Sequence, residues 1–166
     1  PWARGAGDDE QAMATSARMA EIDTAHRLAQ LALAVDALRG RQYAEAERRL
    51  DQAGNGPLAE LTVTLLRAWS EAGLGDTKQA LDTVASLQGP EWYEVFKPYH
   101  SGLIASVGGD EEAAGAYFEQ AYGADPDAIR IVQAWSRHLA RIGRTEEALE
   151  ALGKFERVVP EHPLIV

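Results

Sequence analysis

The chain repeats itself with a period of 34 residues, and this period limits its possible folds more than any other feature. Aligning residues 109–114 with residues 143–148 matches GDEEAA to GRTEEA and places Pro126 over Pro160. The same step backwards divides most of the chain into four units, residues 27–60, 61–94, 95–128 and 129–162. A period of this length is typical of stacked supersecondary units that share one continuous core.

Two columns of this alignment hold only small residues, namely Ala34, Ala68, Gly102 and Ser136 in one and Ala46, Ala80, Ala114 and Ala148 in the other. Small residues allow two helices to approach closely, so each unit is predicted to be a pair of antiparallel helices. Glycine falls between the helices at positions 75, 109 and 143, where a residue with positive φ ends a helix at little cost. The first unit has Arg41 in that column, one place after Gly40, so we expect its turn to be shifted.

Hydrophobic spacing predicts an all-α fold and no strands. The expected helices lie near residues 27–40, 43–53, 59–73, 77–87, 91–107, 111–123, 127–142 and 145–157. Pro98 should kink the fifth of these or split off its first turn. The N-terminal segment 1–26 is expected to contain a packing helix over 8–23, and residues 163–166 look like the truncated start of a further helix. The missing initiator methionine suggests a fragment of a longer protein.

These columns resemble the tetratricopeptide repeat family over about residues 27–162. The third and fourth units match best, through Gly102, Ala114, Phe118, Ala121, Pro126, Ala148, Phe155 and Pro160. The resemblance implies a right-handed superhelical array of four helix hairpins, whose first helices line a concave groove that binds a peptide or protein segment. The Arg-rich, Lys-poor, Ala-rich composition is similar to that of bacterial, proteobacterial repeat proteins, and it leaves both cytoplasm and periplasm open.

The family's groove positions, carried over to this chain, are apolar or aromatic in the first three units and mostly basic in the fourth. They are Leu28, Leu31, Val35 and Leu38, then Thr62, Leu65 and Trp69, then Phe96, Tyr99 and Leu103, and finally Arg130, Gln133, Arg137 and Arg141. The three arginines share one helix face although the net charge is -10. Because guanidinium groups pair well with carboxylates, the expected ligand has an apolar segment followed by an acidic segment or a free C-terminus.

Less specific interpretations of the same residues remain open. Leu65 and Trp69 can pack against the N-terminal helix, and the arginines can form exposed ion pairs of small value with Asp127, Glu146, Glu147 and Glu150. The family's carboxylate clamp needs asparagine and lysine where this chain has Leu31, Val35 and Leu66, so binding of chaperone tails is not expected. Four other aromatic residues are expected in the core, namely Tyr117, Tyr122, Trp135 and Phe155.

Composition argues against several classes of function. The negative charge disfavours nucleic acid, and the absence of cysteine removes thiolate chemistry and sulfur-ligated zinc. No apolar run is long enough to insert into a membrane, and neither a histidine pair at metal-binding spacing nor a phosphate-binding glycine loop occurs. We therefore expect no enzyme, cofactor or metal. The alternative to ligand binding is a structural role in a longer or self-assembling solenoid, because Leu152, Val158 and Val159 would otherwise lack a cover.

Overall fold

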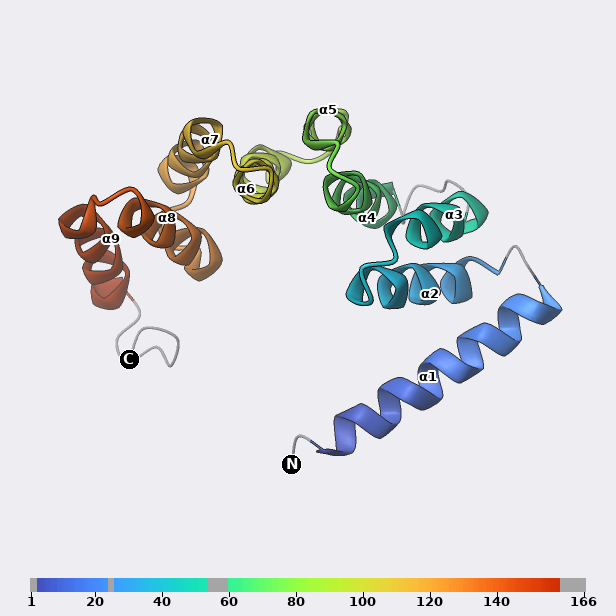
Figure 1. Cartoon of the computed structure of the whole chain (residues 1–166). Coiled ribbons are helices and arrows are strands. Elements are labelled where there is room, and N and C mark those ends of the chain that lie inside the picture. Colours follow the sequence, from blue (N-terminus) through green and yellow to red (C-terminus); the bar gives the residue numbers. More distant parts are fainter. Residues whose placement is uncertain (1–2, 24–25, 54–59, 159–166) are drawn as a thin grey trace. The chain divides into compact units, whose positions relative to one another are not determined.

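A computed structural model describes residues 3–23, 26–53 and 60–158, and this part of the chain is built from helices without strands. Figure 1 labels them α1 (Ala3–Ile22), α2 (Arg27–Arg39), α3 (Tyr43–Ala53), α4 (Glu60–Gly73), α5 (Thr77–Ala85), α6 (Tyr93–Val107), α7 (Glu111–Ala124), α8 (Ile129–Arg141) and α9 (Thr145–Val158). The all-α prediction is confirmed for these residues. From α2 onwards the helix ends agree with the expected ones to within two residues, whereas α1 begins at Ala3 rather than at residue 8.

The same turn links the two helices of every pair, at positions 34 residues apart. Each first helix ends with two backbone hydrogen bonds of a Schellman motif. The longer of the two joins Gln42 N to Ala37 O (2.8 Å), Asp76 N to Glu71 O (3.0 Å), Asp110 N to Ala105 O (3.0 Å) and Arg144 N to Leu139 O (2.8 Å). The period read from the sequence is therefore also a period of backbone geometry.

The expected shift of the first turn is wrong. Arg41 itself takes the positive φ of 57°, in the column where Gly75, Gly109 and Gly143 have φ of 91°, 82° and 85°. Gly40 has an ordinary φ of -80° and serves as the C-cap of α2. The turn keeps its place because the helix pair fixes its length, so a residue with a side chain accepts the left-handed conformation.

The columns of small residues are buried, as a close approach of paired helices requires. Ala34, Ala46, Ala68, Ala80 and Ala114 are fully buried, and Ser136 and Ala148 are 5% and 4% exposed. At Gly102 an added Cβ would lie 2.6 Å from Cδ1 of Phe118. Glycine at this position therefore leaves the space that the Phe118 ring occupies.

The chain divides into two compact units, and the first extends over Pro1–Thr83. Within it α2 pairs with α3, and both helices pack against α4. Ala34, Leu50 and Val63 form a buried cluster there, with Leu31 and Leu66 packed against it. Helix α1 packs on α2, as expected of the N-terminal helix, and Asp9 lies 3.5 Å from Arg39 across that contact.

The second unit extends over Val84–Val166, and in it α6 packs on α7, α7 on α8 and α8 on α9. Its core contains Phe118, Trp135, Leu139 and four alanines, with Tyr117 and Tyr122 packed against them. Together with the buried Phe155, this confirms the predicted core aromatics. Pro98 lies inside α6, so it does not divide the helix. Pro160 and residues 163–166 fall outside the described residues.

Candidate functional site

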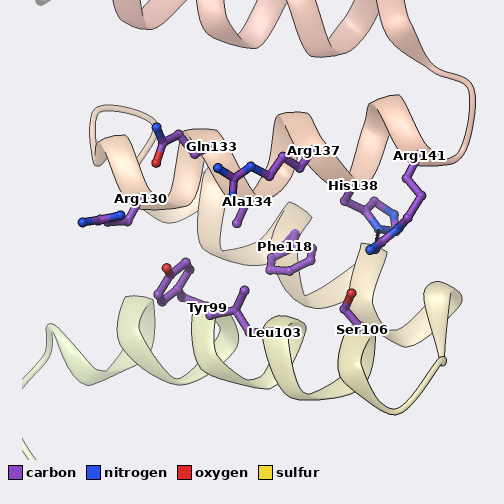
Figure 2. Close-up of a pocket in the computed structure, with 10 residues that line it drawn as sticks. All are labelled: Tyr99, Leu103, Ser106, Phe118, Arg130, Gln133, Ala134, Arg137, His138 and Arg141. Atoms are coloured by element: carbon purple, nitrogen blue, oxygen red, sulfur yellow. Dashed lines mark hydrogen bonds between the residues drawn. The ribbon is translucent and has the colours of Figure 1, made fainter. Parts of the chain in front are cut away.

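A pocket of about 150 Å³ lies between α6 and α8 in the second unit. Figure 2 shows Tyr99, Leu103 and Ser106 on α6 facing a row of α8 side chains, with Phe118 of α7 between the two helices. The α8 residues that line it are Arg130, Gln133, Ala134, Arg137, His138 and Arg141. Six of the fourteen residues predicted to form the ligand groove therefore line one cavity: Tyr99, Leu103, Arg130, Gln133, Arg137 and Arg141.

The other eight predicted groove residues do not line this pocket. Phe96 stands one turn before Tyr99 on α6, where its ring packs against those of Trp92 (5.6 Å) and His100 (4.4 Å). The remaining seven belong to the first unit, namely Leu28, Leu31, Val35, Leu38, Thr62, Leu65 and Trp69. There Leu31 packs against the buried cluster, Val35 is exposed, and Leu65 and Trp69 are half-buried.

The pocket combines an apolar floor with a polar rim. The Phe118 ring and the Leu103 side chain contribute apolar surface, and Phe118 reaches this position because Gly102 has no side chain. The guanidinium groups belong to Arg130, Arg137 and Arg141 of α8. Arg137 lies about two helical turns after Arg130, and Arg141 lies about one turn after Arg137. Such a cavity can hold one apolar side chain and expose a neighbouring carboxylate to the arginines.

The arginines of the rim differ in their ion pairs. Arg141 Nη2 lies 2.6 Å from Oε2 of Glu111, the first residue of α7. No carboxylate among the described residues forms an ion pair with the exposed Arg130 or Arg137. Two of the four carboxylates considered from the sequence have other partners, since Glu147 pairs with Arg144 and Glu150 with Lys154. Two cations of the pocket thus remain available to an acidic ligand.

His138 is a residue of this site that the sequence analysis did not single out. It is 3% exposed, and its ring packs near those of Trp135 (5.9 Å) and Phe118 (5.8 Å). Burial lowers its pKa, the positive charges of Arg141 and Arg144 lower it further, and Glu111 opposes these effects. Because the Glu111 carboxylate comes from a position 30 residues before Arg141, no local spacing in the sequence could have revealed this cluster.

A second histidine, His100, stands on α6 beside Tyr99. Its ring lies 5.1 Å from that of Tyr99 and 4.4 Å from that of Phe96. Burial among these rings lowers the pKa of His100 to about 4, so its imidazole is neutral at physiological pH. His100 therefore adds no positive charge to α6, and the arginines that line the pocket all belong to α8.

The described residues contain no group of three or more His, Cys, Asp or Glu side chains arranged to hold a metal ion. In the same part of the chain, none of the helices combines the length and apolar character needed to span a bilayer. Comparison with protein-family models, with curated proteins and with solved structures gives no match for this chain.

Proposed function

We propose that this chain is a non-enzymatic scaffold that binds a peptide or protein segment along the first helices of its hairpins, in the manner of tetratricopeptide repeats. The proposal includes the right-handed superhelical stacking of hairpins that the resemblance to this family implies. The repeated turn and the buried small columns support a repeat of this kind. The mode of binding would be recognition of a short segment in a groove between helices.

The observation that carries the proposal is the pocket between α6 and α8. It joins residues of two successive first helices, and it has an apolar floor and unpaired arginines on its rim. In a chain of net charge -10, unpaired arginines around a cavity oppose the general field of the protein. The ligand best matched to this site carries an acidic group, either a side chain or a C-terminal carboxylate, next to an apolar residue.

The test is fluorescence anisotropy with a panel of labelled peptides that vary acidic and apolar positions independently. We expect binding of the peptides that carry both features, and a loss of at least about tenfold for Arg137→Glu, since a charge-assisted hydrogen bond contributes about 1.5–3 kcal/mol. Arg157→Glu is the matched control, because it makes the same change of charge on exposed α9 away from the pocket. Equal losses for both variants, or binding that ignores the acidic position, would refute the proposal.

Self-assembly is the second candidate function, and one feature of α9 favours it. Leu149 and Val158 of that helix are 63% and 57% exposed, whereas Leu152 is half-buried. Burial of large apolar side chains between copies would remove them from water. Multi-angle light scattering at increasing concentration tests this candidate. It predicts a dimer that Leu149→Glu dissociates, and a monomer at all concentrations would exclude it.

A further inference from the structure

Three polar side chains meet at one end of the pocket between α6 and α8. Oε2 of Glu111 lies 2.6 Å from Nη2 of Arg141 and 3.5 Å from Nδ1 of His138. The same Nη2 atom lies 3.4 Å from Nδ1 of His138. Figure 2 shows His138 and Arg141 side by side at this end, with Arg130 at the opposite end. The carboxylate of Glu111 therefore already forms an ion pair with Arg141, one of the arginines that line the ligand site.

The imidazole ring of His138 is held in place while the ion pair beside it is partly open to solvent. At Gly115 an added Cβ would lie 2.7 Å from Nε2 of His138, so the ring fills the space that this glycine leaves. In contrast, the Arg141 and Glu111 side chains are 48% and 42% exposed. The cluster thus combines a fixed, buried imidazole with two side chains that can exchange partners.

The protonation state of His138 decides which partner Glu111 has. In the neutral ring Nδ1 can accept a hydrogen bond from Arg141, but in the imidazolium form both ring nitrogens are donors. The imidazolium would repel the guanidinium of Arg141 and attract the carboxylate of Glu111. The charged groups around the ring are Glu111 on α7, Arg137 and Arg141 on α8, and Arg144 after α8, with Glu112 and Glu119 lining a cavity on another side of His138.

We propose that Glu111 is an internal competitor for Arg141, and that a ligand carboxylate displaces it with uptake of one proton by His138. This inference rests on the proposed ligand site. Once the ligand neutralises Arg141, the released Glu111 carboxylate faces Nδ1 and stabilises the imidazolium. By linkage, a ligand that promotes proton uptake binds more tightly as protons become more available. Affinity should therefore rise as the pH falls through the pKa that His138 has with the ligand bound, and level off below the lowered pKa that it has in the free protein.

The first experiment needs no ligand and follows the imidazole of His138 by NMR during a pH titration. Glu111→Gln removes the one neighbour that raises the pKa of His138, so this pKa should fall further below its ordinary value, and Arg141→Gln should raise it. Glu112→Gln, at the adjacent exposed position, is the control and should have the smaller effect. If Glu111→Gln leaves the titration of His138 unchanged, the carboxylate is not coupled to the ring and the inference is wrong.

The second experiment uses hexaglutamate as the probe. Adding it to the wild type should raise the pKa of His138 and move the Nε resonance of Arg141, and Arg141→Gln should abolish the change at His138. Glu111→Gln should bind the probe about two- to fivefold more tightly at neutral pH, the range expected for release of a partly exposed ion pair. It should also lose most of the dependence of affinity on pH.

The outcomes separate this inference from the function on which it rests. Arg137-dependent binding of hexaglutamate without a change at His138 would overturn the competitor role of Glu111 and leave the ligand site standing. No binding of hexaglutamate at any pH would contradict the competitor role of Glu111, whereas the ligand site itself is tested by the peptides that also carry an apolar residue.

Discussion

Replacing Arg41 with glycine should stabilise the protein, although it removes a side chain. Arg41 has a φ of 57°, and a left-handed conformation costs an L-residue about 1–2 kcal/mol. Glycine avoids that cost, but its greater conformational freedom in the unfolded chain destabilises the folded state by about 0.5–1 kcal/mol. The net gain is about 0.5–1 kcal/mol. Arg41 is exposed, and no ion pair of its side chain is found among the described residues, so little opposes this gain.

The assay is urea unfolding followed by circular dichroism, together with thermal melting. For a chain of this size the melting temperature should rise by about 1–4 °C. Gly109→Ala, at the equivalent position two units later, should lower stability by a similar amount, since its φ is 82°. Gly40→Ala is the control, because its backbone is ordinary and an added Cβ has no neighbour closer than 3.6 Å. Loss of stability in both Arg41→Gly and Gly40→Ala would refute this account of the turn.

Three further predictions concern the core and the histidine on α6. In denaturant unfolding, the free energy of unfolding of Gly102→Ala should be at least about 2 kcal/mol lower than that of Gly123→Ala. Both variants gain helix propensity, but only Gly102→Ala puts a Cβ against Phe118. Equal stability of the two variants would contradict the tight contact. Phe118→Ala should cost about 3–5 kcal/mol in the same assay, whereas Phe96→Ala at a half-buried position should cost clearly less. The pKa of His100 is lowered to about 4, so the unfolded chain binds the additional proton; stability should fall by about 3 kcal/mol between pH 6.5 and 4. The His100→Gln variant should lose this part of the pH dependence, and an unchanged pH profile would show that His100 is not its source.

The period of the sequence predicts most of the local structure because every repeated column has a local cause. Small residues pair the helices, and glycine ends the first helix in three of the four turns. The positive φ of Arg41 was not predicted, because residue type alone does not reveal that the packed helices fix the length of a turn. The start of α1 was placed too late, since residues 3–7 have no clear apolar spacing to extend the helix.

Six of the ten residues that line the candidate site were predictable from the sequence, but its ion pairs were not. The resemblance to the repeat family, carried over in register, predicted that Tyr99, Leu103 and the arginines of α8 line a common groove, because equivalent helices present equivalent faces. The contact between Glu111 and Arg141 depends on how α7 packs on α8, and the burial of His138 depends on the space left at Gly115. Such contacts arise from tertiary packing, so no spacing pattern predicts them.

Photo-crosslinking from inside the pocket tests the central functional claim most directly. A photoreactive amino acid replaces Tyr99 in one variant and the exposed Leu149 of α9 in another, and each is irradiated in extract of the native cells. The account predicts that position 99 captures a defined peptide segment with an acidic group beside an apolar residue, and that Arg137→Glu abolishes this capture. Crosslinks that form only from position 149, or that form from position 99 despite Arg137→Glu, would contradict it.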